Sequence, residues 1–143
     1  MISITAVMPY AIGVALSILT ALFLRAAGFD RDRAVYPTIL IVIASYYVLF
    51  AAMGGSAAAL AVESVALLGF TLVAVLGYAR NSWWIVAALA GHGVFDLGHS
   101  RLIENPGVPS WWPAWCLAFD VGFAGCLAVL LLRAETRSSN ATG

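Results

Sequence analysis

The chain has 143 residues and a formal net charge of zero, and its seven basic residues are all arginine. It is 63% hydrophobic and only 10% charged, with a mean hydropathy of +0.97. A soluble domain of this size buries only about two-thirds of its chain surface, so it could not hide this much apolar surface from water. The composition predicts one domain in a lipid bilayer, and the lack of excess positive charge excludes nucleic acid as a partner.

Five apolar segments are long enough to cross about 30 Å of hydrocarbon. They cover residues 4–26, 34–53, 57–78, 82–103 and 111–132. The breaks between them are short, which predicts that consecutive helices are antiparallel neighbours. We therefore expect an all-α integral membrane protein, a five-transmembrane-helix bundle in a single membrane domain over residues 1–133. Residues 134–143 are polar and rich in serine, which predicts a disordered tail.

Arginine is distributed unevenly between the two ends of the predicted bundle. Only Arg101 lies toward one end, and the other six lie toward the opposite end: Arg25, Arg31, Arg33, Arg80, Arg133 and Arg137. The positive-inside rule makes the arginine-rich end cytoplasmic. The N-terminus is then outside and the C-terminal tail cytoplasmic, in a multi-pass protein of the cell inner (plasma) membrane.

Ionisable residues inside predicted spans are energetically costly and by default indicate function. They are Glu63, His92, Asp96, His99 and Asp120. The three on the fourth segment follow an i, i+4, i+7 spacing, which puts them on one helix face. Counting about 1.5 Å per residue from the outer helix ends puts Glu63, Asp96 and Asp120 roughly 9 to 12 Å deep, with Tyr46 and Tyr47 at a similar depth. Four helices therefore bring polar residues to one layer in the outer half of the bilayer.

Neutral imidazole and ionised carboxylate groups suit a divalent metal such as zinc, iron or manganese. We expect His92, Asp96 and His99 to be metal ligands. Glu63 and Asp120 would complete the shell or act catalytically, as general base toward a metal-bound water. Cys116 lies one turn from Asp120 on the same face, but we expect it to be a small packing residue. The pattern favours a metal-binding membrane protein, one form of which is a metal-dependent enzyme acting on a lipid or other apolar molecule.

Two other interpretations fit the same residues. The acids could be relay groups of a proton- or cation-coupled transporter or channel subunit, which at this length would need a homo-oligomer to form a path. Paired histidine and aspartate side chains can also simply join helices, at about 0.6–2 kcal/mol per contact, as in a structural or accessory subunit. The sequence leaves the choice between enzyme, transporter and structural protein open.

The order of these residues resembles the signature of a small uncharacterised family of bacterial integral membrane proteins. The resemblance rests on Glu63, the His-x3-Asp-x2-His run from His92 to His99, and the Trp-Pro-x2-Cys-x3-Asp run from Trp112 to Asp120. This chain has Phe95 and Ser100 where that pattern has tryptophan and a further histidine. The resemblance implies a membrane location and no particular activity. In its chemistry alone, the site is also similar to membrane hydrolases that bind zinc through helix-borne histidine and aspartate.

Overall fold

The computed structural model describes residues 4–31 and 33–141, and all regular structure in these ranges is helical. The helices are α1 (Ile4–Ala27), α2 (Val35–Met53), α3 (Ala57–Arg80), α4 (Trp83–Leu102) and α5 (Trp112–Ala141). The all-α prediction is confirmed, and each helix begins within one residue of its predicted start. Residues 1–3, 32 and 142–143 of the predicted domain and tail lie outside the described residues.

Four of these helices, α1, α2, α3 and α5, are long and apolar enough to cross a membrane. Helix α4 has 20 residues, which is long enough, but it carries two histidines, an aspartate and an arginine and is not among these four. The outward faces of the helices carry large exposed apolar side chains, such as Leu19 on α1 and Val65 on α3. The chain is thus a helical protein whose surface suits a membrane.

The end of α5 differs from the prediction. The helix continues to Ala141, whereas the sequence predicted a disordered tail from residue 134. The segment from Arg133 to Ala141 contains no glycine or proline, and alanine, glutamate and arginine are good helix formers. The change to polar residues after Leu132 marks the end of the apolar surface but not the end of the helix. Residues 134–141 are all exposed.

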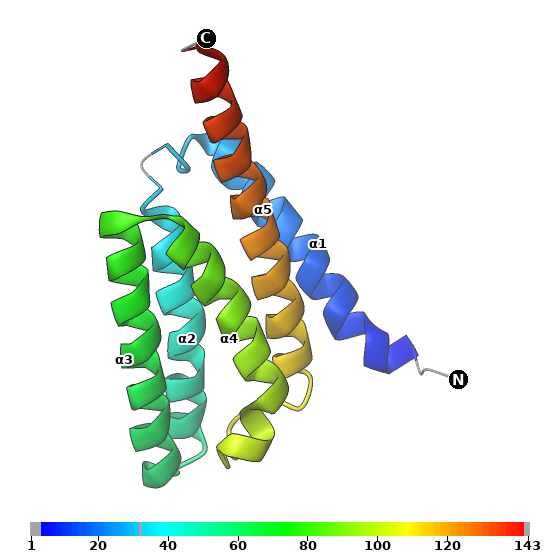
Figure 1. Cartoon of the computed structure of the whole chain (residues 1–143). Coiled ribbons are helices and arrows are strands. Elements are labelled where there is room, and N and C mark those ends of the chain that lie inside the picture. Colours follow the sequence, from blue (N-terminus) through cyan, green and yellow to red (C-terminus); the bar gives the residue numbers. More distant parts are fainter. Residues whose placement is uncertain (1–3, 32, 142–143) are drawn as a thin grey trace.

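The packing of α1 also differs from the prediction. Helix α2 contacts α3, α3 contacts α4, and α4 contacts α5, but α1 packs mainly along α5 and not along α2 (Figure 1). Two glycines allow this close approach: a Cβ at Gly13 would collide with the Trp115 carbonyl, and one at Gly122 would collide with the Ser17 hydroxyl. Small residues let membrane helices pack closely, so this pair selects α5 as the neighbour of α1.

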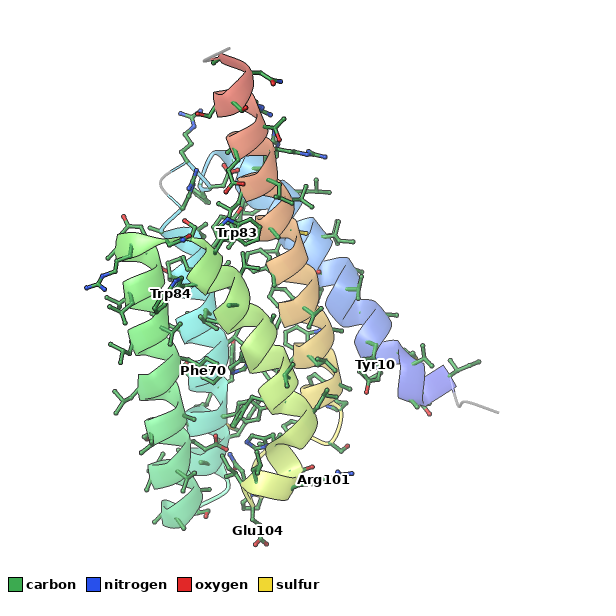
Figure 2. All side chains as sticks on the ribbon, in the orientation of Figure 1. Tyr10, Phe70, Trp83, Trp84, Arg101 and Glu104 are labelled. Atoms are coloured by element: carbon green, nitrogen blue, oxygen red, sulfur yellow. The ribbon has the colours of Figure 1, made fainter. Side chains whose placement is uncertain are left out.

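The α4–α5 connection is fixed on the end of α2. A Cβ at Gly107 would overlap the carbonyl group of Phe50, so only glycine fits at this contact. The Trp112 ring, at the start of α5, lies 4.9 Å from the Phe50 ring. Arg101 and Glu104 lie at this end of the bundle, and Trp83 and Trp84 lie at the opposite end (Figure 2). These contacts hold the connection over the polar residues described below.

Candidate metal centre

The ionisable residues of α3, α4 and α5 meet inside the bundle. Glu63, His92, Asp96, His99 and Asp120 are each at most 2% exposed. They form two groups, one centred on His92 and one on His99. Tyr47 of α2 lies between the two groups and contacts both.

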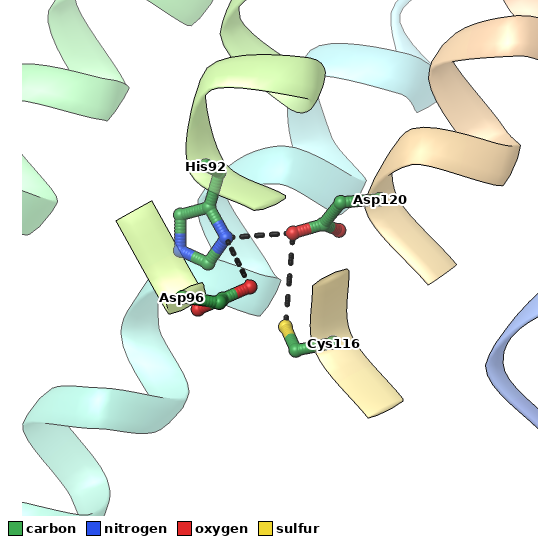
Figure 3. A group of neighbouring side chains, drawn as sticks. All are labelled: His92, Asp96, Cys116 and Asp120. Carbon is green, nitrogen blue, oxygen red and sulfur yellow. Dashed lines mark hydrogen bonds and ion pairs between the residues drawn. The ribbon is translucent and has the colours of Figure 1, made fainter. Parts of the chain in front are cut away.

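The first group consists of His92, Asp96, Cys116 and Asp120, and we call it the metal group (Figure 3). Each residue offers one ligand atom, and these atoms all lie within 4.8 Å of one another. His92 Nδ1 shares a hydrogen bond of 2.7 Å with Asp120 Oδ2 and lies 3.6 Å from Asp96 Oδ2. The Cys116 thiol donates to Asp120 Oδ2 at 3.7 Å. The four side chains could hold a metal ion.

Two carboxylate oxygens of the metal group have no hydrogen-bond partner within the described chain. They are Asp96 Oδ2 and Asp120 Oδ1, and both are buried. A buried polar atom left unsatisfied costs about 1–3 kcal/mol, so a native fold usually provides a partner. A cation bound among these side chains would be that partner, which makes the group a chemical fit for a metal.

The second group joins His99 to Glu63. His99 Nε2 and Glu63 Oε1 share a hydrogen bond of 2.7 Å. Asn105, in the α4–α5 connection, donates from Nδ2 to Glu63 Oε1 at 2.9 Å and to the Tyr47 carbonyl at 3.0 Å. The other oxygen of Glu63, Oε2, is buried and has no hydrogen-bond partner among the described residues.

Tyr47 connects the two groups. Its hydroxyl donates to Asp96 Oδ1 at 2.6 Å, and its ring stacks on the His99 ring with a centroid distance of 4.0 Å. Because Asp96 Oδ1 is held by Tyr47, Asp96 Oδ2 is left to face His92. If Asp96 binds a metal, loss of a side chain that orients it in this way would typically cost about 10- to 100-fold in metal affinity.

The predicted ligands are therefore not all assembled at one point. His92 and Asp96 belong to the metal group, as does Asp120, but His99 pairs with Glu63 instead. The reason is height: seven residues along a helix correspond to about 10 Å, too far for His92 and His99 to bind one ion. Cys116, which we expected to be a packing residue, is the fourth member of the metal group. Its i, i+4 spacing to Asp120 was the signal that it faces the same point.

The chain matches no protein-family model, no curated protein and no solved structure. The resemblance to the bacterial membrane family therefore stays a prediction. What can be concluded about function rests on the apolar helices and on the two buried polar groups.

Proposed function

We propose that the protein crosses the plasma membrane five times, and that α4 crosses it together with α1, α2, α3 and α5. The buried side of α4 carries the polar residues His92, Asp96 and His99, and its exposed residues include Val94 and Leu97. A helix with its polar residues buried and apolar residues exposed is compatible with lipid despite a modest mean hydropathy. The excess of arginine at the end of the α3–α4 turn supports a cytoplasmic location for that end and an outside location for the α4–α5 connection.

We further propose that this membrane protein binds a transition-metal ion, with zinc as the first choice. The observation that carries the proposal is the buried set of four ligand atoms within 4.8 Å. Tetrahedral zinc with bonds of about 2.0–2.3 Å needs ligand atoms about 3.3–3.8 Å apart. The longest separations in the set therefore have to shorten by roughly 1 Å, and the 2.7 Å between His92 Nδ1 and Asp120 Oδ2 has to lengthen. A cysteine and a histidine among the ligands favour zinc or iron over manganese, which prefers oxygen.

Structural zinc sites have four protein ligands and no free position, whereas catalytic zinc sites have three protein ligands and keep the fourth position open for water. The four side chains of the metal group resemble the structural kind. They therefore suit a firmly bound metal better than a catalytic one. A metal-dependent reaction on a lipid or other apolar molecule would require one of the four side chains to give way to water. Glu63 and His99 would then be the nearest buried acid–base pair outside the metal group.

The experiment that tests metal binding uses the two cysteines as a matched pair. Cys116 is in the metal group, and Cys126 lies on the same helix outside it and is partly buried. Protein purified in mild detergent should contain, or take up, a stoichiometric amount of zinc. Cys116→Ser and Asp120→Asn should lower zinc occupancy, and Cys126→Ser should retain it. The proposal fails if the unaltered protein binds no metal on addition, or if the two cysteine variants behave alike.

One observation favours a second candidate function, a proton- or cation-coupled transporter. Hydrogen bonds join Asp120 to His92, Asp96 to Tyr47, and His99 to Glu63. The His92–Asp96 contact of 3.6 Å and the stack of Tyr47 on His99 link these three pairs into one buried series. A buried chain of titratable groups is typical of proton relays. In proteoliposomes, this function predicts a pH-dependent flux that is lost in Glu63→Gln. The absence of any flux from the unaltered protein would refute it.

A further inference from the structure

A pocket of about 570 Å³ lies at the end of the bundle that carries the α4–α5 connection. Its walls come from the end of α4, the connection and the start of α5, with Tyr10 of α1 at one side. Asp96 and His99, almost fully buried, line its inner part, and the exposed Glu104 and Ser110 line its outer part. The pocket thus leads from the protein surface to the two buried polar groups.

The charge of the pocket is acidic. Among the residues that line it, Asp96 and Glu104 carry carboxylates, and none is an arginine. A cleft lined by charge of one sign, with low-dielectric walls, concentrates ions of the opposite sign and repels ions of the same sign. The pocket therefore suits a cation and opposes a phosphate or carboxylate group, including the headgroup of an anionic lipid.

Asp96 belongs both to the wall of this pocket and to the metal group. Tyr47 fixes its Oδ1 atom, and its Oδ2 atom lies 3.6 Å from His92 Nδ1 with no hydrogen-bond partner among the described residues. A cation that reaches the inner end of the pocket would meet a ligand of the metal group directly. An ion with its first shell of water needs roughly 200 Å³, at about 30 Å³ per water, so the pocket has room for a hydrated ion.

We propose that this pocket is the route by which a hydrated divalent transition-metal cation reaches the metal group, with Glu104 attracting the ion and Asp96 receiving it. This inference rests on the proposed metal binding, and it adds the end of the bundle through which the metal ion enters and leaves. Metal enters and leaves at the end of the α4–α5 connection, which is the outer side in the proposed topology. The ligand class is a cation that loses its water at Asp96, and not an anionic lipid headgroup.

The test measures the rate at which purified protein takes up zinc from solution, with a fluorescent zinc indicator as the competitor. Ser110→Cys, in a Cys126→Ser background, is modified with a bulky maleimide to obstruct the pocket. Ser139→Cys, exposed near the far end of α5, is the matched control. Treatment of the background alone reports any reaction at Cys116. Modification at position 110 should slow zinc uptake at least about tenfold and leave the final occupancy unchanged, whereas modification at position 139 should not slow it.

Charge at the pocket mouth supplies a second measurement. Glu104→Gln should slow zinc uptake about two- to fivefold at low ionic strength, and Glu104→Arg should slow it more. The effect should shrink between about 0.01 M salt, where the screening length is about 30 Å, and about 1 M salt, where it is about 3 Å. Glu135→Gln, at the opposite end of the bundle, should have no effect on the rate.

The outcomes separate this inference from the proposed function. If the unaltered protein binds no zinc, metal binding itself is refuted. If zinc binds stoichiometrically but its rate of uptake is the same after modification at positions 110 and 139, and is unchanged in the Glu104 variants, only the access route is refuted. In proteoliposomes of known orientation, zinc should load from the side of the α4–α5 connection, and loading from the other side alone would also refute the route.

Discussion

Tyr47→Phe removes a single hydroxyl group from the contact between the two polar groups. The hydroxyl donates to Asp96 Oδ1 at 2.6 Å, and Tyr47 is 1% exposed. A hydrogen bond to a charged group contributes about 1.5–3 kcal/mol to stability, and its loss leaves a buried carboxylate oxygen without a partner. The phenyl ring retains the shape that stacks on His99, so the free energy of unfolding should fall by about this amount without a change in packing.

The matched control for this prediction is Tyr36→Phe on the same helix. Tyr36 is also 1% exposed, but its hydroxyl has no hydrogen-bond partner within the described chain. Removing that hydroxyl should leave the free energy of unfolding unchanged or raise it. Unfolding in mixed detergent micelles, followed by circular dichroism, compares the two variants. Equal losses of stability in both would refute the assignment of Tyr47 as the residue that holds Asp96.

Tyr47→Phe should also weaken zinc binding, because a ligand that is no longer oriented binds metal about 10- to 100-fold less tightly. Zinc titration of the variant and of Tyr36→Phe measures this separately from stability. A double-mutant cycle with Asp96→Asn then isolates the contact between the two side chains. If the two substitutions have additive effects on zinc affinity, Tyr47 does not act through Asp96.

Further predictions concern the metal, its pH dependence and the fixed connection. Zinc at about 100 times its dissociation constant should raise the free energy of unfolding by about 2.7 kcal/mol, and Cys116→Ser should abolish this gain in thermal denaturation. Cys116→Asp should shift the preference from zinc toward manganese in competition titrations, because oxygen replaces sulfur. Zinc affinity should fall as the pH is lowered, with protons released on binding, because imidazole and thiol ligands must lose their protons. Gly107→Ala should destabilise the protein because its Cβ would overlap the Phe50 carbonyl, whereas Gly91→Ala, with open space around it, should be neutral or stabilising in the same denaturation assay.

The starts of the helices could be predicted because membrane-suited helices are bounded by short polar breaks that hydropathy detects. The end of α5 could not, because hydropathy reports where the apolar surface ends, and the backbone remains helical through Ala134 and Glu135. The pairing of α1 with α5 depends on Gly13 fitting against Trp115 and on Gly122 fitting against Ser17, contacts that join residues more than a hundred positions apart in the sequence. No local pattern specifies such a contact.

The residues of the site could be predicted in part, because local spacing gives some of their geometry and not the rest. Counting residues gives the height of a side chain along its helix, and this placed Glu63, Asp96 and Asp120 at similar depths. Counting does not give the rotation of one helix relative to the next, which decides which side chains face each other. The height of His99, about 10 Å from His92 along α4, already separates it from the metal group. The rotation of α3 and α5 then decides that His99 faces Glu63 and that Cys116 faces the metal group.

The unsatisfied oxygens argue against a purely structural role for these residues. Glu63, Asp96 and Asp120 each leave one buried carboxylate oxygen without a hydrogen-bond partner in the described residues. A network that only joins helices gains most when every member is satisfied, and well-packed apolar residues often stabilise a core as well as a buried ion pair does. Three carboxylates, each with a buried oxygen left unpaired, lower stability unless something binds to them. Two of these oxygens, on Asp96 and Asp120, belong to the metal group, and Asp96 also lines the pocket. A cation that arrives through the pocket, as proposed above, would be the partner that these two oxygens lack.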